Sequence, residues 1–300
     1  MQAIPKVFQL GYVSLGVSDI EESRDHYLRT MGVTETDRSE DGTTYASIGL
    51  NHHDLVLSPA IQPGQAQIGL QLTPDIDLAD FASDVKAFGL RAEIKSDSQP
   101  GIGTMVEVVG PDDYVIQFYR DADLTAPGYA GAGISPLRLG HVALMSPKAD
   151  ELVTFFREFL GFYKTDQIGD RATFLTCNHE HHVLNIVNSP ETLVHHIAFQ
   201  LHESADHVRA ADTLRSHGKK TVWGPSRHTA GHNLAAYHLD PDKVIVELYT
   251  DMDIYLPAAD CFEQRPWHED TPQRPKVWGP QLSAWEVDFL FSLGSRTAAD

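Results

Sequence analysis

The chain has 300 residues, of which 42% are hydrophobic, and this length suits two globular domains of about 150 residues each. Its 42 acidic residues against 23 basic ones give a formal net charge of −19, which argues against binding to nucleic acid or to an anionic membrane. With only two cysteines, the composition excludes a disulfide framework and a thiolate metal cluster. Residues 1–9 lack the apolar core of a signal peptide, and no stretch approaches about 18 apolar residues, so we expect a cytoplasmic protein.

The N-terminal half of the chain is a faint copy of the C-terminal half. Two segments match at a shift of 129 residues and a third at a shift of 130. The matched pairs are 10–15 (LGYVSL) with 139–144 (LGHVAL), 67–72 (QIGLQL) with 196–201 (HIAFQL), and 115–119 (VIQFY) with 245–249 (IVELY). The repeat predicts two similar domains.

Each half is expected to contain two units in which a strand is followed by a helix and then by further strands. The better defined units are those of the C-terminal half, where apolar positions recur at helical spacing over 150–160 and 205–217, with Gly161 and Gly218 placed to end these helices. The strands predicted around them are 139–145, 171–176, 183–187, 196–201, 233–239 and 244–249. The expected fold class is therefore α+β, with four βαβββ modules paired into two similar domains.

Two irregular regions complete the plan. Residues 121–136 hold Gly, Ala and Pro without periodicity, which is typical of a linker. The region 251–300 has five prolines but also three tryptophans, which favour a tail packed on the body over a disordered one. We therefore expect module pairs at 1–120 and 137–250, joined by the linker and followed by the tail.

Three polar side chains interrupt apolar strands of the C-terminal half, namely His141, His196 and Glu247. With 16 histidines in the chain, a single one is more simply explained as a surface or core residue. A buried imidazole or carboxylate without a partner is costly, however, and the aligned residues of the other half are Tyr12, Gln67 and Gln117. Two imidazoles and a carboxylate form the facial triad of non-haem Fe(II) oxygenases, which leaves coordination positions open for substrate and dioxygen. A salt-bridge network in the core is the alternative explanation.

The sequence resembles the type I extradiol ring-cleavage dioxygenases of the vicinal oxygen chelate superfamily over nearly its whole length. The LGHVAL and HHIAF segments resemble the two histidine-ligand motifs, and 228–247 (HTAGHNLAAYHLDPDKVIVE) resembles the family signature. In that signature a histidine lies 19 residues and a tyrosine 10 residues before the ligand glutamate, here His228 and Tyr237. Lys243 departs from a usual glycine and Ala236 from a usual larger apolar residue.

The resemblance implies a glyoxalase-like fold with a metal-free N-terminal half and a catalytic C-terminal half. It implies that His141, His196 and Glu247 bind Fe(II), although the same ligands suit Mn(II). His195 is the rival of His196, but adjacent strand residues point to opposite faces, and the family's ligand directly precedes the IAF run. The family motif therefore selects His196 as the metal ligand.

The resemblance also implies further active-site residues. His181 matches the family's acid/base histidine, although the cluster at 179–182 (HEHH) allows an error of one residue. His228 and Tyr237 would hydrogen-bond the substrate oxygens. Trp223 stands where some relatives place an arginine, so it would favour an apolar ring substituent; packing against the tail explains it equally well. A solvated turn for His181, and ordinary loop and strand roles for His228 and Tyr237, are the alternatives.

The implied reaction is cleavage of a catecholic ring next to the diol, with both atoms of O2 incorporated, by a protein that is a homo-oligomer like its relatives. One alternative is another metalloenzyme of the superfamily, such as a glyoxalase-like lyase or isomerase, which usually has a fourth protein ligand. A second is a non-catalytic small-molecule binding protein, which needs no such triad. The sequence specifies neither the natural catechol nor proximal or distal cleavage.

Overall fold

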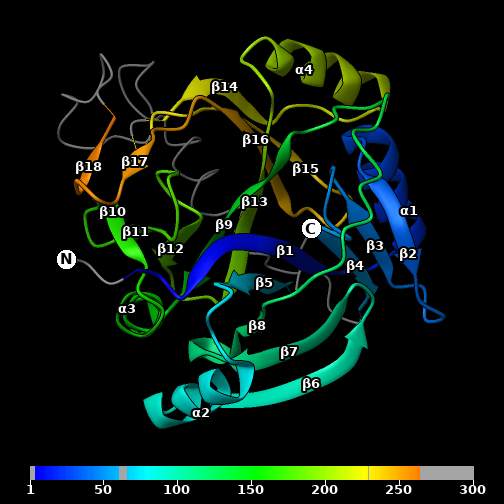
Figure 1. Cartoon of the computed structure of the whole chain (residues 1–300). Coiled ribbons are helices and arrows are strands. Elements are labelled where there is room, and N and C mark those ends of the chain that lie inside the picture. The colour runs from blue at the N-terminus through cyan, green and yellow to red at the C-terminus, as the bar shows by residue number, and fades with distance from the viewer. Residues whose placement is uncertain (1–3, 61–65, 229, 264–300) are drawn as a thin grey trace.

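The fold consists of two eight-stranded sheets, seen in a computed structural model that describes residues 4–60, 66–228 and 230–263 (Figure 1). The first sheet contains β1 (Val7–Val17), β2 (Thr34–Arg38), β3 (Thr44–Ser47), β4 (Leu55–Pro59), β5 (Ala66–Leu72), β6 (Arg91–Gln99), β7 (Ile102–Val109) and β8 (Val115–Tyr119). The second contains β9 (Arg138–Ser146), β10 (Tyr163–Ile168), β11 (Ala172–Thr176), β12 (Leu184–Asn188), β13 (Leu193–Gln200), β14 (Trp223–Arg227), β15 (Leu234–Leu239) and β16 (Ile245–Thr250). A separate hairpin pairs β17 (Tyr255–Leu256) with β18 (Cys261–Phe262).

The two sheets have the same strand order. The first runs β2-β3-β4-β1-β5-β8-β7-β6, and the second runs β10-β11-β12-β9-β13-β16-β15-β14. Each is thus two units of four strands joined where the first strands of the units, β1 with β5 and β9 with β13, pair antiparallel. The expected α+β fold of four paired modules is confirmed.

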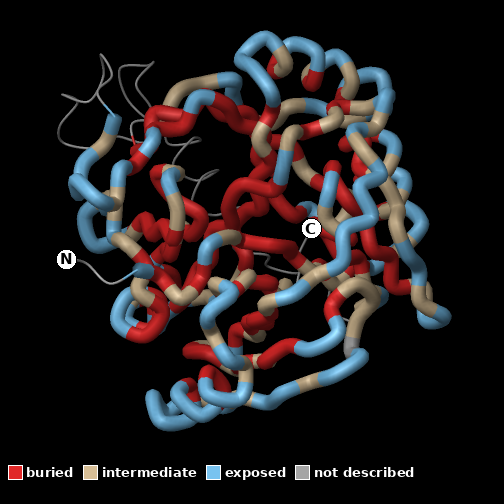
Figure 2. Tube along the Cα trace, viewed as in Figure 1, coloured by how far each residue is buried: buried red, intermediate tan, exposed pale blue. Residues whose placement is uncertain are grey.

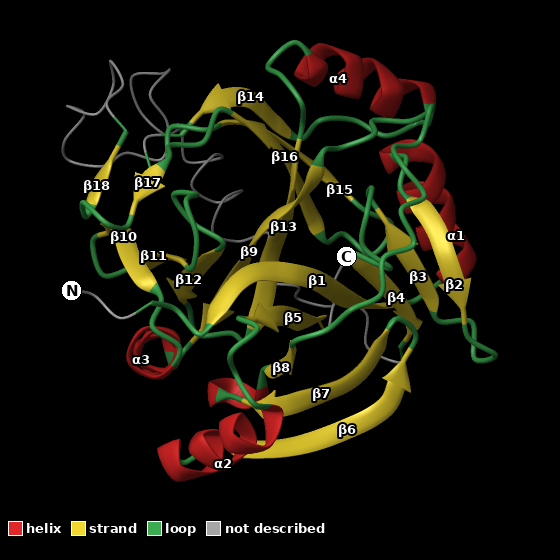
Figure 3. Cartoon of the chain, in the orientation of Figure 1, coloured by secondary structure: helices red, strands yellow, loops and turns green. Residues whose placement is uncertain are grey.

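Short helices connect the first and second strands of each unit (Figure 3). They are α1 (Ile20–Arg24) continued by the π-helical η1 (Asp25–Met31), α2 (Leu78–Phe88), α3 (Ala149–Thr154) continued by the π-helical η3 (Phe155–Phe159), and α4 (Asp206–Ser216); η2 (Pro111–Asp113) is a single turn before β8. Gly161 and Gly218 follow η3 and α4 at positive φ, as expected of glycines that end helices. No helix in the described ranges has the length and apolar character needed to cross a bilayer.

The two halves share one hydrophobic core. Aliphatic and aromatic residues of β1, β5 and β8 form a continuous buried cluster with those of β9, β13, α3 and η3. At this junction Phe81 of α2 packs against Phe118 of β8 and Phe159 of η3. Figure 2 shows the consequence, since the strands at the centre of the molecule are buried while the outer faces of α2 and α4 are exposed.

The structure differs from the sequence-based elements at several places. It adds β10 and β14, which the sequence did not predict, at the outer edges of the second sheet. The predicted helix 150–160 is present but becomes π-helical in its second half. Of the predicted tail at 251–300, the β17–β18 hairpin is described, and residues 264–300 lie outside the described residues.

Candidate metal centre

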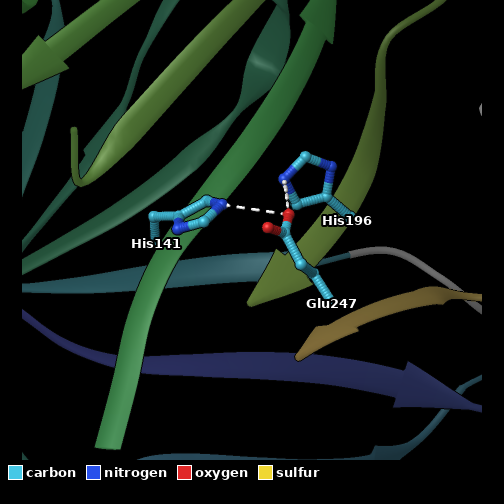
Figure 4. Close-up of side chains that lie close together, drawn as sticks. All are labelled: His141, His196 and Glu247. Carbon is cyan, nitrogen blue, oxygen red and sulfur yellow. Dashed lines mark hydrogen bonds and ion pairs between the residues drawn. The ribbon is translucent and has the colours of Figure 1, made fainter. Parts of the chain in front are cut away.

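Three neighbouring strands place His141, His196 and Glu247 on one face of the second sheet. β13 lies between β9 and β16, and its Ala198 is paired with His141 on one side and with Glu247 on the other. His196 precedes Ala198 by two residues, and side chains two residues apart in a strand share a face. The three side chains therefore converge, as Figure 4 shows.

The distances within this group suit a metal ion. Glu247 Oε2 lies 3.3 Å from His141 Nε2 and 3.2 Å from His196 Nε2. Ligands held at right angles by bonds of about 2.1 Å lie about 3 Å apart, so both distances match a shared ion. All three ligand atoms lie within 4.8 Å of one another, and all three residues are buried. His196 Nε2 makes no hydrogen bond although it is buried, which leaves a lone pair for a metal.

The electrostatics of the group favour a cation. Burial raises the pKa of the Glu247 carboxyl, but the neighbouring His141 and His196 outweigh it and bring this pKa down to about 2. Burial also lowers the pKa of His196 well below its usual value, so this imidazole is neutral near pH 7. A carboxylate beside two imidazoles forms the mixed nitrogen and oxygen donor set that divalent transition metals accept.

Asn233 supports the group and was missed by the sequence reasoning. Its buried amide donates from Nδ2 to Glu247 Oε1 over 2.9 Å, which fixes the carboxylate so that Oε2 faces the two histidines. Such contacts to a metal ligand orient it and tune its affinity. No spacing rule predicts the contact, because Asn233 precedes β15 in a turn whose path the sequence does not specify.

His228 and Tyr237 meet beside the candidate ligands, as the resemblance implied. His228 Nε2 lies 2.8 Å from the Tyr237 hydroxyl, and Tyr237 is paired with Glu247 across β15 and β16. The Tyr237 ring stacks on His196 and on Trp223, with ring centroids 5.8 Å and 5.0 Å away. Both His228 and Tyr237 line the cavity that contains the candidate ligands.

Trp223 packs against other aromatic rings and is not among the described residues that line the cavity. It is buried and stacks on the rings of His228 and Tyr237, each at 5.0 Å, while those two rings form the cavity wall. The substrate contact predicted for Trp223 is therefore not supported, and its packing partners are these two rings.

The structure moves the candidate acid/base residue from His181 to His182. His182 lines the cavity and its ring lies 4.3 Å from that of His141. His181 points away, with Nε2 3.4 Å from Asp166 Oδ2 and its ring stacked on Phe262. The two histidines are adjacent in an irregular segment before β12, so the sequence could not place the residue that faces the cavity to within one position.

The expectation that His195 faces away from the site is wrong. Its ring lines the same cavity, and its Nδ1 lies 2.7 Å from Nδ1 of His196. The register of β13 against β9 shifts between Val194 and His196, and such a bulge breaks the alternation of faces. The group of possible ligands nevertheless contains His196 and not His195.

The remaining wall of the cavity is apolar. It is formed on β10, β11, β12 and the turn before β15 by Ile168, Ala172, Phe174, Val187 and Ala230. Four of these five residues are buried and, together with Met145, belong to one hydrophobic cluster. Among the described residues that line the cavity, Glu247 alone carries a carboxylate and none is Lys or Arg.

The N-terminal half fills the equivalent position with side chains. The Tyr12 hydroxyl donates to Gln117 Oε1, which replaces the contact between His141 and Glu247. A Cβ on Gly69 would meet the Tyr12 ring at 2.1 Å, so the larger ring requires a glycine where β13 has Ala198. In the described part of the N-terminal half, no group of possible metal ligands is found.

Comparisons with known proteins agree with this geometry. Residues 138–248 match the model of the Glyoxalase/Bleomycin resistance protein/Dioxygenase superfamily. This segment is a domain of that superfamily. The predicted resemblance of the chain to extradiol dioxygenases of the vicinal oxygen chelate superfamily is confirmed.

Several curated relatives span most of the chain. A metapyrocatechase of Pseudomonas sp. (strain CF600) is 28% identical over 257 residues, which cover 78% of this chain and 83% of the relative. A manganese-dependent 2,3-dihydroxybiphenyl 1,2-dioxygenase of Geobacillus genomosp. 3 is 24% identical over 92% of this chain and 95% of the relative.

Several solved structures share the fold. The 2,3-dioxygenase LapB from Pseudomonas sp. KL28 superposes with a TM-score of 0.79 at 24% identity, covering 85% of this chain and 96% of that one. The Mn(II)-bound glyoxalase from Novosphingobium aromaticivorans superposes with a TM-score of 0.75 at 27% identity, covering 83% of this chain and 84% of that one. The glyoxalase shows that the fold alone does not select the reaction.

Proposed function

We propose that this protein is a metal-dependent extradiol dioxygenase that opens a catecholic ring beside the diol with both atoms of O2. The observation that carries the proposal is the buried group of His141, His196 and Glu247 in the wall of a cavity that is also lined by further histidines and a tyrosine. The similarity to metapyrocatechase and to dihydroxybiphenyl dioxygenase supports it.

His141, His196 and Glu247 would hold the metal ion, which would supply the Lewis-acid and redox chemistry for the reaction of a catechol with O2. Of the two metals the triad suits, we propose Fe(II) as the resident ion. Mn(II) is the alternative, since one relative is manganese-dependent.

The surrounding side chains would accept a proton from the substrate and donate a hydrogen bond to it. Burial lowers the pKa of His182 well below its usual value, so a neutral imidazole is available near pH 7 to accept a proton from a catechol hydroxyl. Burial, reinforced by the Glu247 carboxylate, raises the pKa of Tyr237 well above its usual value. Tyr237 therefore remains a phenol and can donate a hydrogen bond to substrate oxygen, with His228 as its partner.

The apolar wall favours an uncharged ring substituent. Ile168, Phe174 and Val187 offer no partner for a carboxylate, whose burial without one is costly. We therefore expect catechols with alkyl or aryl substituents to be better substrates than catechols with a carboxylated side chain.

Oxygen consumption tests the proposal. Protein loaded anaerobically with Fe(II), and separately with Mn(II), is mixed with catechol, 3-methylcatechol, 2,3-dihydroxybiphenyl and homoprotocatechuate. We expect oxygen uptake and a yellow product, with kcat/KM lowest for the carboxylated homoprotocatechuate. Glu247→Ala, handled identically, should consume no oxygen. Absence of uptake by the wild type with every catechol and both metals would contradict the proposal.

A glyoxalase-like lyase or isomerase is the second candidate, because the Mn(II)-bound glyoxalase shares the fold at 27% identity. That reaction needs no oxygen, so conversion of an α-oxoaldehyde and glutathione under anaerobic conditions would favour it. A non-catalytic binding protein would convert neither substrate. The homo-oligomeric state and the cytoplasmic location remain predictions, of which the first is measured by light scattering of the purified protein.

A further inference from the structure

Behind the cavity, three side chains form a line from the surface to the candidate metal centre. Asp166 on β10 lies 3.4 Å from His181 Nε2, and His181 Nδ1 lies 3.0 Å from His182 Nδ1. The His181 side chain is only 2% exposed, whereas Asp166 is 15% exposed. Of the three, only His182 lines the cavity. Both ring nitrogens of His181 are thus engaged between a carboxylate and the cavity histidine.

For a neutral His181, the ion pair with Asp166 and the hydrogen bond to His182 indicate where the protons lie in this line. A neutral imidazole has one N–H and one bare nitrogen. The negative charge of Asp166, 3.4 Å away, favours the N–H of a neutral His181 on Nε2, which leaves its Nδ1 bare. Two nitrogens 3.0 Å apart share one proton, and it must then come from Nδ1 of His182. His182 is left with a bare Nε2, the nitrogen not engaged by His181.

From this chain of contacts we propose that Asp166 and His181 are positioning residues for the ring cleavage. They hold His182 in the tautomer whose Nε2 can accept a proton from the bound diol. The inference rests on the proposed function, in which His182 is the proton acceptor. Metal-binding histidines are known to be oriented by similar outer contacts, and losing such a contact reduces activity about 10- to 100-fold.

The N-terminal half contains the same three residue types in the same order, with a longer contact to the carboxylate and without the metal group. Asp37 lies 3.9 Å from His52 Nε2, and His52 Nδ1 lies 2.9 Å from His53 Nδ1. There the remaining nitrogen of His53 faces the Gln99 amide nitrogen at 2.9 Å. An amide NH2 only donates, so His53 Nε2 must be bare, which is the tautomer deduced for His182. The copy supplies a matched control, because a purely structural line would behave alike in both halves.

The first test compares Asp166→Asn with Asp37→Asn in the metal-loaded protein. Asp166→Asn should lower kcat about 10- to 100-fold while KM for the catechol and the metal content stay within about twofold of wild type. Asp37→Asn should keep the wild-type kcat. The thermal unfolding of both variants is measured as well, so that a loss of folding is detected separately from a loss of activity. An unchanged kcat in Asp166→Asn, or equal losses of kcat in the two variants, would overturn the inference.

The second test reads the tautomer directly and does not need activity. Nitrogen-15 histidine-labelled, metal-free protein is studied by long-range proton–nitrogen NMR, and His182 is identified by the signals lost in His182→Gln. We expect protonated Nδ1 and bare Nε2 in the wild type, and a mixture of tautomers in Asp166→Asn. Protonated Nε2 in the wild type would refute the inference. If the wild type cleaves no catechol, the proposed function fails, and this spectrum still decides the tautomer.

Discussion

At the scale of single residues, the candidate site depends on which nitrogen or oxygen each side chain presents. Asn233 engages Oε1 of Glu247 and so leaves Oε2 to the two histidines. His195 engages Nδ1 of His196, which leaves Nε2 of His196 as the possible ligand atom. The neighbours of the triad thus determine which of its atoms are available to a metal ion.

The two adjacent histidines of β13 should therefore respond differently to replacement. His196→Ala removes a donor atom and is expected to abolish binding of one equivalent of Fe(II), measured by metal analysis after anaerobic loading. His195→Ala removes only the contact to Nδ1 and should retain the metal, with affinity reduced by at most about 100-fold. The reverse pattern would show that the bulge in β13 presents His195 as the ligand.

At the scale of elements, the sequence predicted the strands that carry the triad but not all of their surroundings. β9, β13 and β16 are apolar runs interrupted by charged or polar side chains, and this pattern together with the family resemblance located the ligands. β10 and β14 are edge strands with mixed exposure, so their sequences show no clear alternation. The bulge in β13 and the one-residue displacement from His181 to His182 depend on backbone pairing and loop path, which periodicity does not encode.

A buried histidine pair between η1 and β15 predicts a pH effect on stability. His26 and His238 lie 5.3 Å apart between ring centroids, and none of their ring nitrogens makes a hydrogen bond. Burial, with His238, Lys219 and His217 nearby, lowers the pKa of His26 well below 6.5. Burial and Lys219 lower the pKa of His238 to about 3. The folded state therefore keeps both rings neutral at pH values where the unfolded chain binds protons.

The free energy of unfolding should consequently fall as the pH drops below about 6.5 and continue to fall toward about 3. His26→Leu removes one of these groups, so its loss of stability between about pH 8 and pH 5 should be smaller than that of wild type by up to about 2 kcal/mol. Urea unfolding at both pH values measures this. The exposed His202, changed to Gln, serves as control, and an equal pH dependence of wild type and His26→Leu would contradict the explanation.

At the scale of the whole molecule, one half carries the site and the other supports it. The turn at Asp112 in the first half bonds the Ser146 hydroxyl at the end of β9, and Asp242 in the second half bonds Ser18 beyond the end of β1. The Tyr114 hydroxyl lies 2.7 Å from the carbonyl oxygen of Met145 on β9. These reciprocal contacts attach the triad-bearing sheet to its metal-free copy.

The asymmetry between the halves predicts one metal ion per chain. Tyr12 and Gln117 bond each other where the second half has His141 and Glu247, so the first half offers no comparable donor set among its described residues. Anaerobic titration with Fe(II), followed by removal of free metal, should saturate at one equivalent. A second tightly bound equivalent that persists in Glu247→Ala would show that the first half also binds metal.

The central claim, ring opening with both atoms of O2, is tested most directly by labelled oxygen. Metal-loaded protein is given 2,3-dihydroxybiphenyl or 3-methylcatechol under oxygen-18 gas, and the product is analysed by mass spectrometry. We predict a ring-opened product that carries two labelled atoms, before any exchange with water, and one dioxygen consumed per catechol. Unaltered catechol, or a quinone without label, would contradict the account.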